Sequence, residues 1–185
     1  MLLTTSQSSM QIILGKLSSS IAFLLLMLVA GLPIYSLVFL FGGISPSQLG
    51  LIFLFFLLTM ITVGSIGVMF STITRKTIVA MIATYGTMIF LSIVTAFFFM
   101  ITVQVNMMGT GAIQSPSPIA HFWASINPGI LIFTLLNPTT EEFVTEMTQI
   151  DFPVWAGFTI FYVVLAVTAI IISIKKLRVN MNRSK

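Results

Sequence analysis

Long runs of apolar residues alternate with short polar segments along this chain. Four runs are long enough, at about 20 residues, to cross the hydrocarbon core of a bilayer as helices. They contain no Asp, Glu, Lys, Arg or His, and they cover approximately residues 21–41, 49–72, 78–103 and 154–174. Backbone groups in lipid must pair within their own segment, so each run predicts a helix. The pattern predicts an all-α, polytopic membrane protein with one transmembrane domain over residues 1–185.

Composition supports a lipid environment for most of the chain. Charged residues make up 6% of it and hydrophobic residues 57%, with a mean hydropathy of +1.12. An ordinary soluble domain is roughly 25% charged. The chain has no Cys, which excludes disulfides and thiolate metal sites.

The charges are separated along the chain. The basic residues are Lys16, Arg75, Lys76, Lys175, Lys176, Arg178, Arg183 and Lys185, and the acids are Glu141, Glu142, Glu146 and Asp151. With four spans and a cytoplasmic N-terminus, every basic residue falls in the cytoplasm and every acid outside. Basic residues near span ends set orientation. The positions of these charges therefore predict cytoplasmic termini, including the tail 175–185. The net charge of +4 is explained by membrane orientation, which argues against nucleic acid as a partner.

The polar connections predict where helices begin. Ser45, Pro46 and Gln48 have the pattern of a capping box with Pro at the first helical position. The outer segment 104–153 is long, and its Gly/Ser/Pro-rich first part predicts a flexible connection. Thr139 and Glu142 predict a second capping box, which starts a short polar helix. Trp123 and Trp155 flank this region as expected of aromatic anchors at the headgroup level.

One apolar segment in the outer region is interrupted by two Asn-Pro pairs, Asn127-Pro128 and Asn137-Pro138. The uninterrupted part, residues 129–136, would extend only about 12 Å as a helix, well short of the roughly 30 Å hydrocarbon core. A fifth span would also place the basic tail outside. The segment is therefore predicted to be a short re-entrant or interfacial helix on the outer side.

No motif in the chain supports catalysis or cofactor binding. Gly15-Lys16 lacks the earlier Gly and the following Ser or Thr of a phosphate-binding loop, so ATP hydrolysis by this chain is not expected. His121 is the single histidine, and it is interpreted as a polar residue at the membrane boundary, without enough further ligands for a metal. The three glutamates are interpreted as a solvated first helical turn rather than a cation site. The predicted enzyme class, cofactor and metal are all none.

Small residues predict close helix packing or part of a pathway. Gly64, Gly67 and Ser71 share one face of the second span, and such faces let helix backbones approach each other in lipid. The third span repeats the pattern with Ala80, Ala83 and Gly86. Pro33 is predicted to bend the first span near its middle, where freed carbonyls can line a pathway.

The N-terminal residues 1–18 form an amphipathic pattern. Leu3, Met10, Ile13, Leu14 and Leu17 share one helical face. Polar and small residues lie largely elsewhere; they include Thr5, Ser8, Gln11, Gly15 and Lys16. This pattern suits either a partner surface or the cytoplasmic face of the membrane.

Several sequence runs, taken in order, resemble the permease subunit of ABC-2 type transporters. They are "LLTTSQSSMQIILGK", the "LP" of the first span, "FGGISPSQ", "GSIGVMFSTITRKTIVAMIATYG" and "LLNP", which together cover essentially the whole chain. The resemblance implies a membrane subunit in a prokaryotic plasma (inner) membrane. It also implies a separate cytosolic ATPase and a second permease copy or paralogue as partners.

The resemblance places the chain at the family's third to sixth spans. It implies that the N-terminal run is the loop that docks on the ATPase, with Leu3, Thr4, Thr5, Ser8, Met10, Gln11, Ile13, Leu14, Gly15 and Lys16 as coupling residues. The family's first two spans are missing, and Ser6 stands where a Pro often follows the Thr pair. A fragment of a six-span permease is expected, and a split permease completed by another polypeptide is the alternative.

Two other classes of function stay open at this point. A membrane scaffold or sensor component without an ATPase would explain the lack of a visible substrate site. A small channel or ion-coupled carrier fits less well, because such proteins usually carry charged residues within their spans. The sequence does not distinguish among possible substrates.

Overall fold

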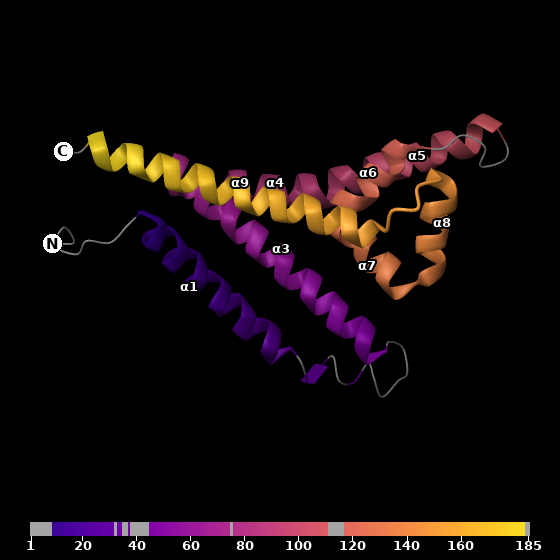
Figure 1. Cartoon of the computed structure of the whole chain (residues 1–185), viewed down its shortest axis with the longest axis horizontal. Helices are drawn as coiled ribbons and strands as arrows, with labels where there is room; N and C mark the ends of the chain where they lie inside the picture. Colours follow the sequence, from indigo (N-terminus) through magenta and orange to yellow (C-terminus); the bar gives the residue numbers. More distant parts are fainter. Residues whose placement is uncertain are drawn as a thin grey trace.

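The computed structural model of the chain describes residues 9–31, 33, 34, 37, 45–74, 76–110 and 117–183. Every regular element in these ranges is a helix (Figure 1). In chain order the elements are α1 (Ser9–Ala30), α3 (Pro46–Ile73), α4 (Thr77–Ile89), the π-helical turn η1 (Phe90–Val94), α5 (Thr95–Thr110), α6 (Pro118–Ile126), α7 (Pro128–Leu136), α8 (Pro138–Thr148) and α9 (Val154–Arg183).

Four stretches of helix in the described residues are long and apolar enough to cross a membrane. They are Met10–Ala30, Pro46–Ile73, Thr77–Asn106 and Val154–Leu177. The protein is thus a polytopic α-helical membrane protein, which confirms the predicted fold class. The third stretch is continuous through α4, η1 and α5. The short helices α6 and α7 meet at a bend of 96°, the geometry of a broken span or a re-entrant loop.

The first span differs from the prediction. α1 runs without a break from Ser9 to Ala30, so the predicted N-terminal helix and the predicted span join in one helix. A turn at Gly31 ends it. Pro33 follows this turn, and most of the predicted span after it lies outside the described residues, so the bend at Pro33 stays a prediction.

Only one of the two predicted capping boxes forms. At the start of α3 the Ser45 N–H donates to Gln48 Oε1 at 3.0 Å, and the Gln48 N–H donates to Ser45 Oγ at 3.3 Å. The second prediction is wrong, because α8 begins at Pro138 and Thr139 lies inside it. A proline at the first helical position is preorganised for a helix and fixes this earlier start.

The centre of the molecule is the contact between α3 and α9. Phe55 and Phe158 meet edge to face with ring centroids 5.9 Å apart. Thr62 is fully buried, and its hydroxyl donates to the Tyr162 carbonyl at 3.2 Å across the two helices. This core continues into the short helices α6, α7 and α8 through Ala124, Leu131 and Val144. The bent helix pair is therefore fixed against the two central spans.

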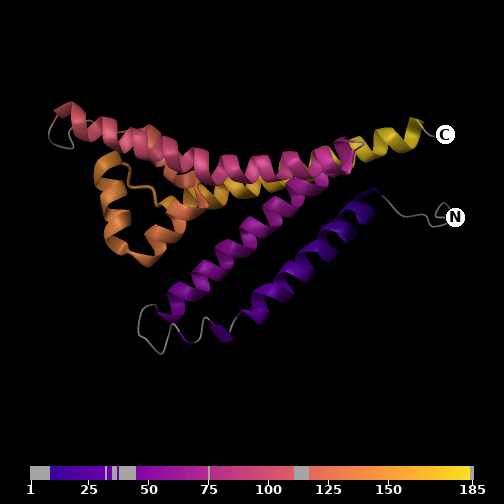
Figure 2. The ribbon, with the colours of Figure 1, turned by 180° about the vertical axis from the view of Figure 1, so that it is seen from behind.

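The two ends of the molecule carry opposite charges. The beginning of α1 and the end of α9 lie at one end of the molecule, and α8 lies at the other (Figures 1 and 2). At the first end α1 packs on α3 and α9, with Ile13 and Leu17 buried. Lys16, Lys76, Lys175 and Lys176 belong to this end, whereas all four acids lie on α8 or just before α9. The fold therefore gathers in space the charges that the sequence separates along the chain.

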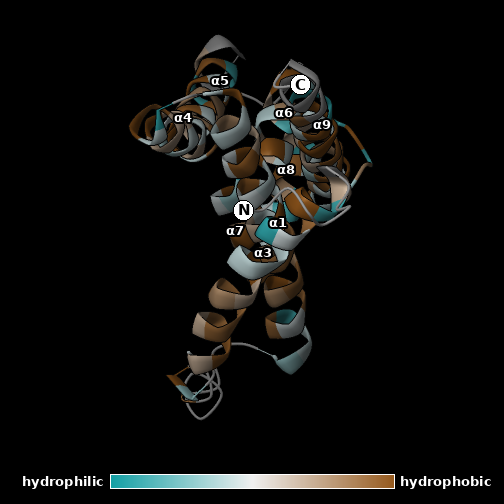
Figure 3. Cartoon of the chain, turned by 90° about the vertical axis from the view of Figure 1, so that its left-hand side faces the viewer, coloured by the Kyte–Doolittle hydropathy of each residue, from teal (hydrophilic) through white to brown (hydrophobic). Residues whose placement is uncertain are grey.

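Apolar side chains cover the outside of the long helices as well as the core. Figure 3 shows hydrophobic residues spread along these helices. Phe23, Leu26, Ile78 and Met100, for example, are each more than half exposed. A protein in water rarely shows contiguous apolar surface on this scale. These faces are suited to contact with lipid.

Candidate functional site: the hydrogen-bonded break between α6 and α7

The third span contains a π-helical turn at its middle. Within η1 the backbone is wider than an α-helix, and the Thr95 N–H is shared between the carbonyls of Phe90 and Ser92. Thr95 is fully buried, and its hydroxyl donates to the Leu91 carbonyl at 2.6 Å. Such turns are rare and occur frequently at functional sites. The widened turn leaves the Ser92 carbonyl oriented for a partner outside its own helix.

That partner is Asn127, the residue between α6 and α7. Its Nδ2 donates to the Ser92 carbonyl at 2.7 Å and lies 2.8 Å from Thr95 Oγ1. Its Oδ1 accepts from the N–H groups of Gly129 and Ile130 at 2.8 and 3.0 Å, which caps α7. Asn127 is only 2% exposed. One buried amide therefore satisfies a helix start and holds the bent pair to the π-helical turn.

Tyr162 of α9 adds a second set of contacts to this break. We call the hydrogen bonds of Asn127 and Tyr162 together the joint. Its hydroxyl donates to the Ile126 carbonyl at 3.2 Å, at the end of α6. Its ring stacks on Phe158 with centroids 4.0 Å apart. Irregular backbone at membrane depth is tolerated only where its polar groups find partners in protein or in a water-filled cavity. Asn127 and Tyr162 supply such partners, so the break is a built feature that joins the bent pair α6–α7 to the third span and to α9.

Removing the Tyr162 hydroxyl tests how much this joint contributes. Tyr162→Phe keeps the ring but leaves the buried Ile126 carbonyl without its donor. We expect the free energy of unfolding in detergent micelles to fall by about 1 kcal/mol. Tyr85→Phe, at an exposed position, is the control and should leave stability unchanged. Equal stabilities for the two variants would show that the hydrogen bond does not support the break.

A large apolar hollow lies beside the joint. It measures about 840 Å³ and lies between α7 and the π-helical part of the third span. Ser92 and Asn127 are among its lining residues, and Phe97, Met100 and Phe133 contribute exposed apolar side chains. Hollows of about 300–1,000 Å³ with few polar groups are typical of sites for small apolar ligands. The joint thus forms part of the wall of a space that apolar molecules can enter.

The predicted coupling residues fall partly within the described structure. Leu3, Thr4, Thr5 and Ser8 lie outside the described residues. Ile13 is buried against the chain itself, and Met10, Gln11, Leu14, Gly15 and Lys16 are exposed on α1. Lys16 Nζ donates to Ser71 Oγ at 3.0 Å, which ties this segment to α3. The exposed face that remains includes Gly15, where a Cβ would meet no described atom within 4 Å.

The predicted small-residue faces contact two different helices. A Cβ on Gly64 would lie 3.1 Å from Leu17 Cδ1 of α1, and one on Gly67 would lie 3.7 Å from Thr84 Cγ2 of α4. Ser71 contacts Lys16 of α1. On α4, Ala80 is buried and Ala83 is half-buried, whereas Gly86 is exposed. The small residues of α3 therefore contact two helices, α1 and α4. On α4 the small residues become more exposed from Ala80 to Gly86.

His121 lies inside the fold, beside Ser125 on α6. Both are more than nine-tenths buried, and neither the His121 ring nitrogens nor Ser125 Oγ have a hydrogen-bond partner among the described residues. The His121 ring packs edge-on to Phe152, with centroids 6.2 Å apart. No group of three or more His, Cys, Asp or Glu in the described part of the chain could hold a metal.

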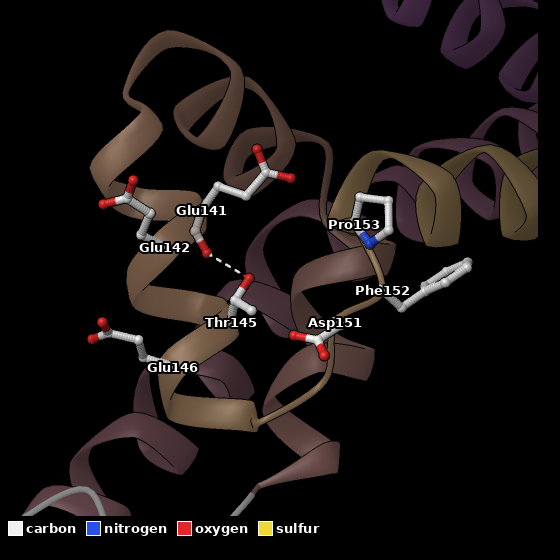
Figure 4. A pocket seen from close by; sticks show the side chains of 7 residues that line it. All are labelled: Glu141, Glu142, Thr145, Glu146, Asp151, Phe152 and Pro153. Atoms are coloured by element: carbon white, nitrogen blue, oxygen red, sulfur yellow. Dashed lines mark hydrogen bonds between the residues drawn. The ribbon is translucent and has the colours of Figure 1, made fainter.

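The four acids surround one hollow at the α8 end. Glu141, Glu142 and Glu146 project from α8, and Asp151 lies on the segment that leads to α9 (Figure 4). The hollow measures about 470 Å³, and Thr145, Phe152 and Pro153 complete its lining. Periodicity predicts the glutamates on a polar helix, but it does not predict that Asp151 returns to the same hollow.

The sequence pattern locates the break but not the joint. Asn127 is predicted only to interrupt an apolar run. A stronger signal was present, because Asn directly before Pro combines a favourable N-cap with a favourable first helical residue. A buried amide in an apolar segment also needs partners. The partners of this amide, Ser92 and Thr95, and the bond from Tyr162 to the neighbouring Ile126 carbonyl have no signature in the sequence.

Comparisons with protein-family models, curated proteins and solved structures give no match to this chain. The fold and the joint define the class: a multi-pass α-helical membrane protein in which a bent helix pair is held between the third and last spans.

Proposed function

We propose that the chain is a membrane-spanning subunit of an ATP-driven transporter of the ABC-2 permease type. It would form part of the substrate pathway and transmit movement from a separate cytosolic ATPase, in a complex with a second permease copy or paralogue. The end that carries the termini would face the cytoplasm of a prokaryotic cell. ATP hydrolysis would take place on the partner.

The observation that carries this proposal is the bent pair α6–α7, bonded to the third span through Asn127 and to the last span through Tyr162. Broken helices at membrane depth are a feature of transporters and channels, where they border a pathway. A scaffold needs no such break. The charged residues of the spans, Lys16, Lys175 and Lys176, lie only near span ends, and none lies in the interior, where ion coupling would be favoured. An external source of energy is therefore the better explanation.

The exposed start of α1 supports the expected coupling role. This segment resembles the ATPase-docking loop of the family, and it lies at the end of the molecule that gathers the basic residues. Gly15 is exposed there, and a side chain at this position would meet no described atom within 4 Å of its Cβ. A partner that presses on this segment would act directly on α3 and α9, because Ile13 and Leu17 pack on both helices.

A steric block on α1 tests the proposal. We expect the chain, expressed in its full genomic context, to co-purify with the ATPase encoded beside its gene. Gly15→Trp should lower that yield at least roughly tenfold, equivalent to about 1.4 kcal/mol of binding free energy. Gly50→Trp is the matched control, since a Cβ at Gly50 also meets no described atom within 4 Å, at the other end of the molecule.

Two results would contradict the proposal. One is a stable complex that contains no ATPase, together with intact transport in cells that lack the gene; this would favour a scaffold. The other is equal loss of the ATPase in both glycine variants, which would show that the α1 surface is not the docking site.

A further inference from the structure

An apolar groove runs along α3 on the side where α8 and α9 approach it. It consists of two adjoining hollows of about 380 and 570 Å³, which share Leu54, Phe55 and Thr159 as lining residues. Its lining on α3 extends from Leu51 to Ile61, about 15 Å of helix rise. Most of the lining is apolar, and Leu54 is exposed. An occupant of this groove has to be apolar and extended.

The end of the groove near α8 has a different chemistry. Glu141 and Trp155 line the larger hollow there, and Glu141 also lines the acidic hollow with Glu142, Glu146 and Asp151. The groove and the acidic hollow therefore meet at the Glu141 carboxylate. Among the described residues that line these hollows none is basic.

This combination selects one kind of occupant. The concentrated negative charge attracts cations and repels anionic headgroups. The exposed indole of Trp155 offers an aromatic face, and such faces bind quaternary ammonium groups. An apolar helix of a second copy would cover Glu141 without pairing it, which is unfavourable. The charge of the acidic hollow and the shape of the groove therefore both favour an elongated apolar molecule with a cationic end as the occupant.

We propose that this groove binds an amphiphile with a single apolar tail and a quaternary ammonium headgroup. The tail lies along α3, and the headgroup lies between Glu141 and Trp155. The proposal concerns binding by the chain itself, so it does not depend on the proposed permease role or on an ATPase.

The test uses dodecyltrimethylammonium as the probe. The full chain with Trp123→Phe, in dodecyl maltoside micelles, reports on Trp155 through its fluorescence. We expect a saturable change as the probe replaces a small fraction of the neutral detergent. Glu141→Gln should raise the half-saturation point roughly tenfold, equivalent to about 1.4 kcal/mol of binding free energy. Thr159→Phe, which fills the shared part of the groove, should abolish saturation.

Matched variants separate the site from general effects on the protein. Glu146→Gln removes an acid that lines the acidic hollow but not the groove, and Thr168→Phe places the same ring at an exposed position of α9. Both should bind the probe as the unchanged chain does. Dodecanoate and tetramethylammonium should give no saturable change, because one lacks the cation and the other lacks the tail.

The proposal is overturned if dodecanoate saturates the signal as well as the cationic probe does. It is also overturned if tetramethylammonium alone gives the full effect, since the groove would then play no part. Unchanged binding in Glu141→Gln and Thr159→Phe would show that the probe only partitions into the micelle.

Discussion

Replacing Asn127 with alanine is expected to lower the free energy of unfolding by about 2–4 kcal/mol. The change removes the cap of α7, typically about 1 kcal/mol, because the N–H groups of Gly129 and Ile130 lose the Oδ1 acceptor. It also removes the bonds from the amide to the Ser92 carbonyl and to the buried Thr95 Oγ1, at about 1–3 kcal/mol. Thermal or denaturant unfolding in detergent micelles measures the loss.

Asn137→Ala is the matched control for this prediction. Asn137 also precedes a proline and a short helix, but it is exposed and its side chain does not cap the start of α8. Its Nδ2 makes only a long bond, at 3.5 Å, to the Phe133 carbonyl. Its replacement should change stability by less than about 0.5 kcal/mol. Similar losses at both positions would contradict the assignment of the joint to Asn127.

Asn127→Asp separates the two halves of the joint. An aspartate keeps an oxygen for the N–H groups of α7 but has no amide to donate to the Ser92 carbonyl. We expect α7 to stay capped while the contact with η1 is lost. The test compares two cysteine pairs, one placed across α5 and α7 and the other across α7 and α3. In Asn127→Asp, the rate of cross-linking should change only for the first pair. Unaltered cross-linking at that pair would mean that the amide does not hold the third span.

The second large effect is expected at Gly157, where α9 crosses α6. A Cβ at this position would lie 2.6 Å from Ser125 Oγ and 2.9 Å from Ser125 Cβ. Gly157→Ala must therefore push α6 away from α9 and disturb the core below it. We expect a loss of about 1–3 kcal/mol in unfolding free energy, measured in the same micelles.

A second substitution should rescue this defect. Ser125→Gly removes both atoms that clash, so Ser125→Gly with Gly157→Ala should recover most of the stability that Gly157→Ala loses. Gly86→Ala provides the control, because Gly86 is exposed and a Cβ there meets no described atom within 4 Å. Alanine is the better helix former, so this control should be neutral or stabilising by up to about 1 kcal/mol. A stable Gly157→Ala variant would show that α6 does not approach α9 this closely.

The residue pattern alone is sufficient for several features of this protein. Apolar runs without charges predict four spanning helices and, with the separated charges, a molecule with one basic and one acidic end. The start of α3 is equally local, because Ser45 and Gln48 satisfy each other's backbone within one helical turn. These features depend on contacts between near neighbours or on the solvent, and both can be read from composition and spacing.

Helix ends without such local partners are predicted less well. Hydropathy alone places the beginning of the first span at about residue 21, whereas α1 begins at Ser9. The helix starts earlier because the amphipathic N-terminal segment continues into the apolar run without a helix breaker between them. The same limitation affects Thr139, whose capping pattern is correct in composition but is displaced by the start at Pro138.

The two Asn-Pro pairs show what only the tertiary structure decides. Asn127 and Asn137 occupy the same local sequence context, and each precedes a short helix. Asn127 is buried, and its amide donates to the Ser92 carbonyl of η1 and to Thr95 Oγ1 of α5, while Tyr162 of α9 bonds the neighbouring Ile126 carbonyl. Asn137 remains exposed. The sequence by itself determined the spans, the charge separation and the position of the break. Packing between distant helices decided which asparagine became the joint, because a buried amide is stable only where other elements satisfy it.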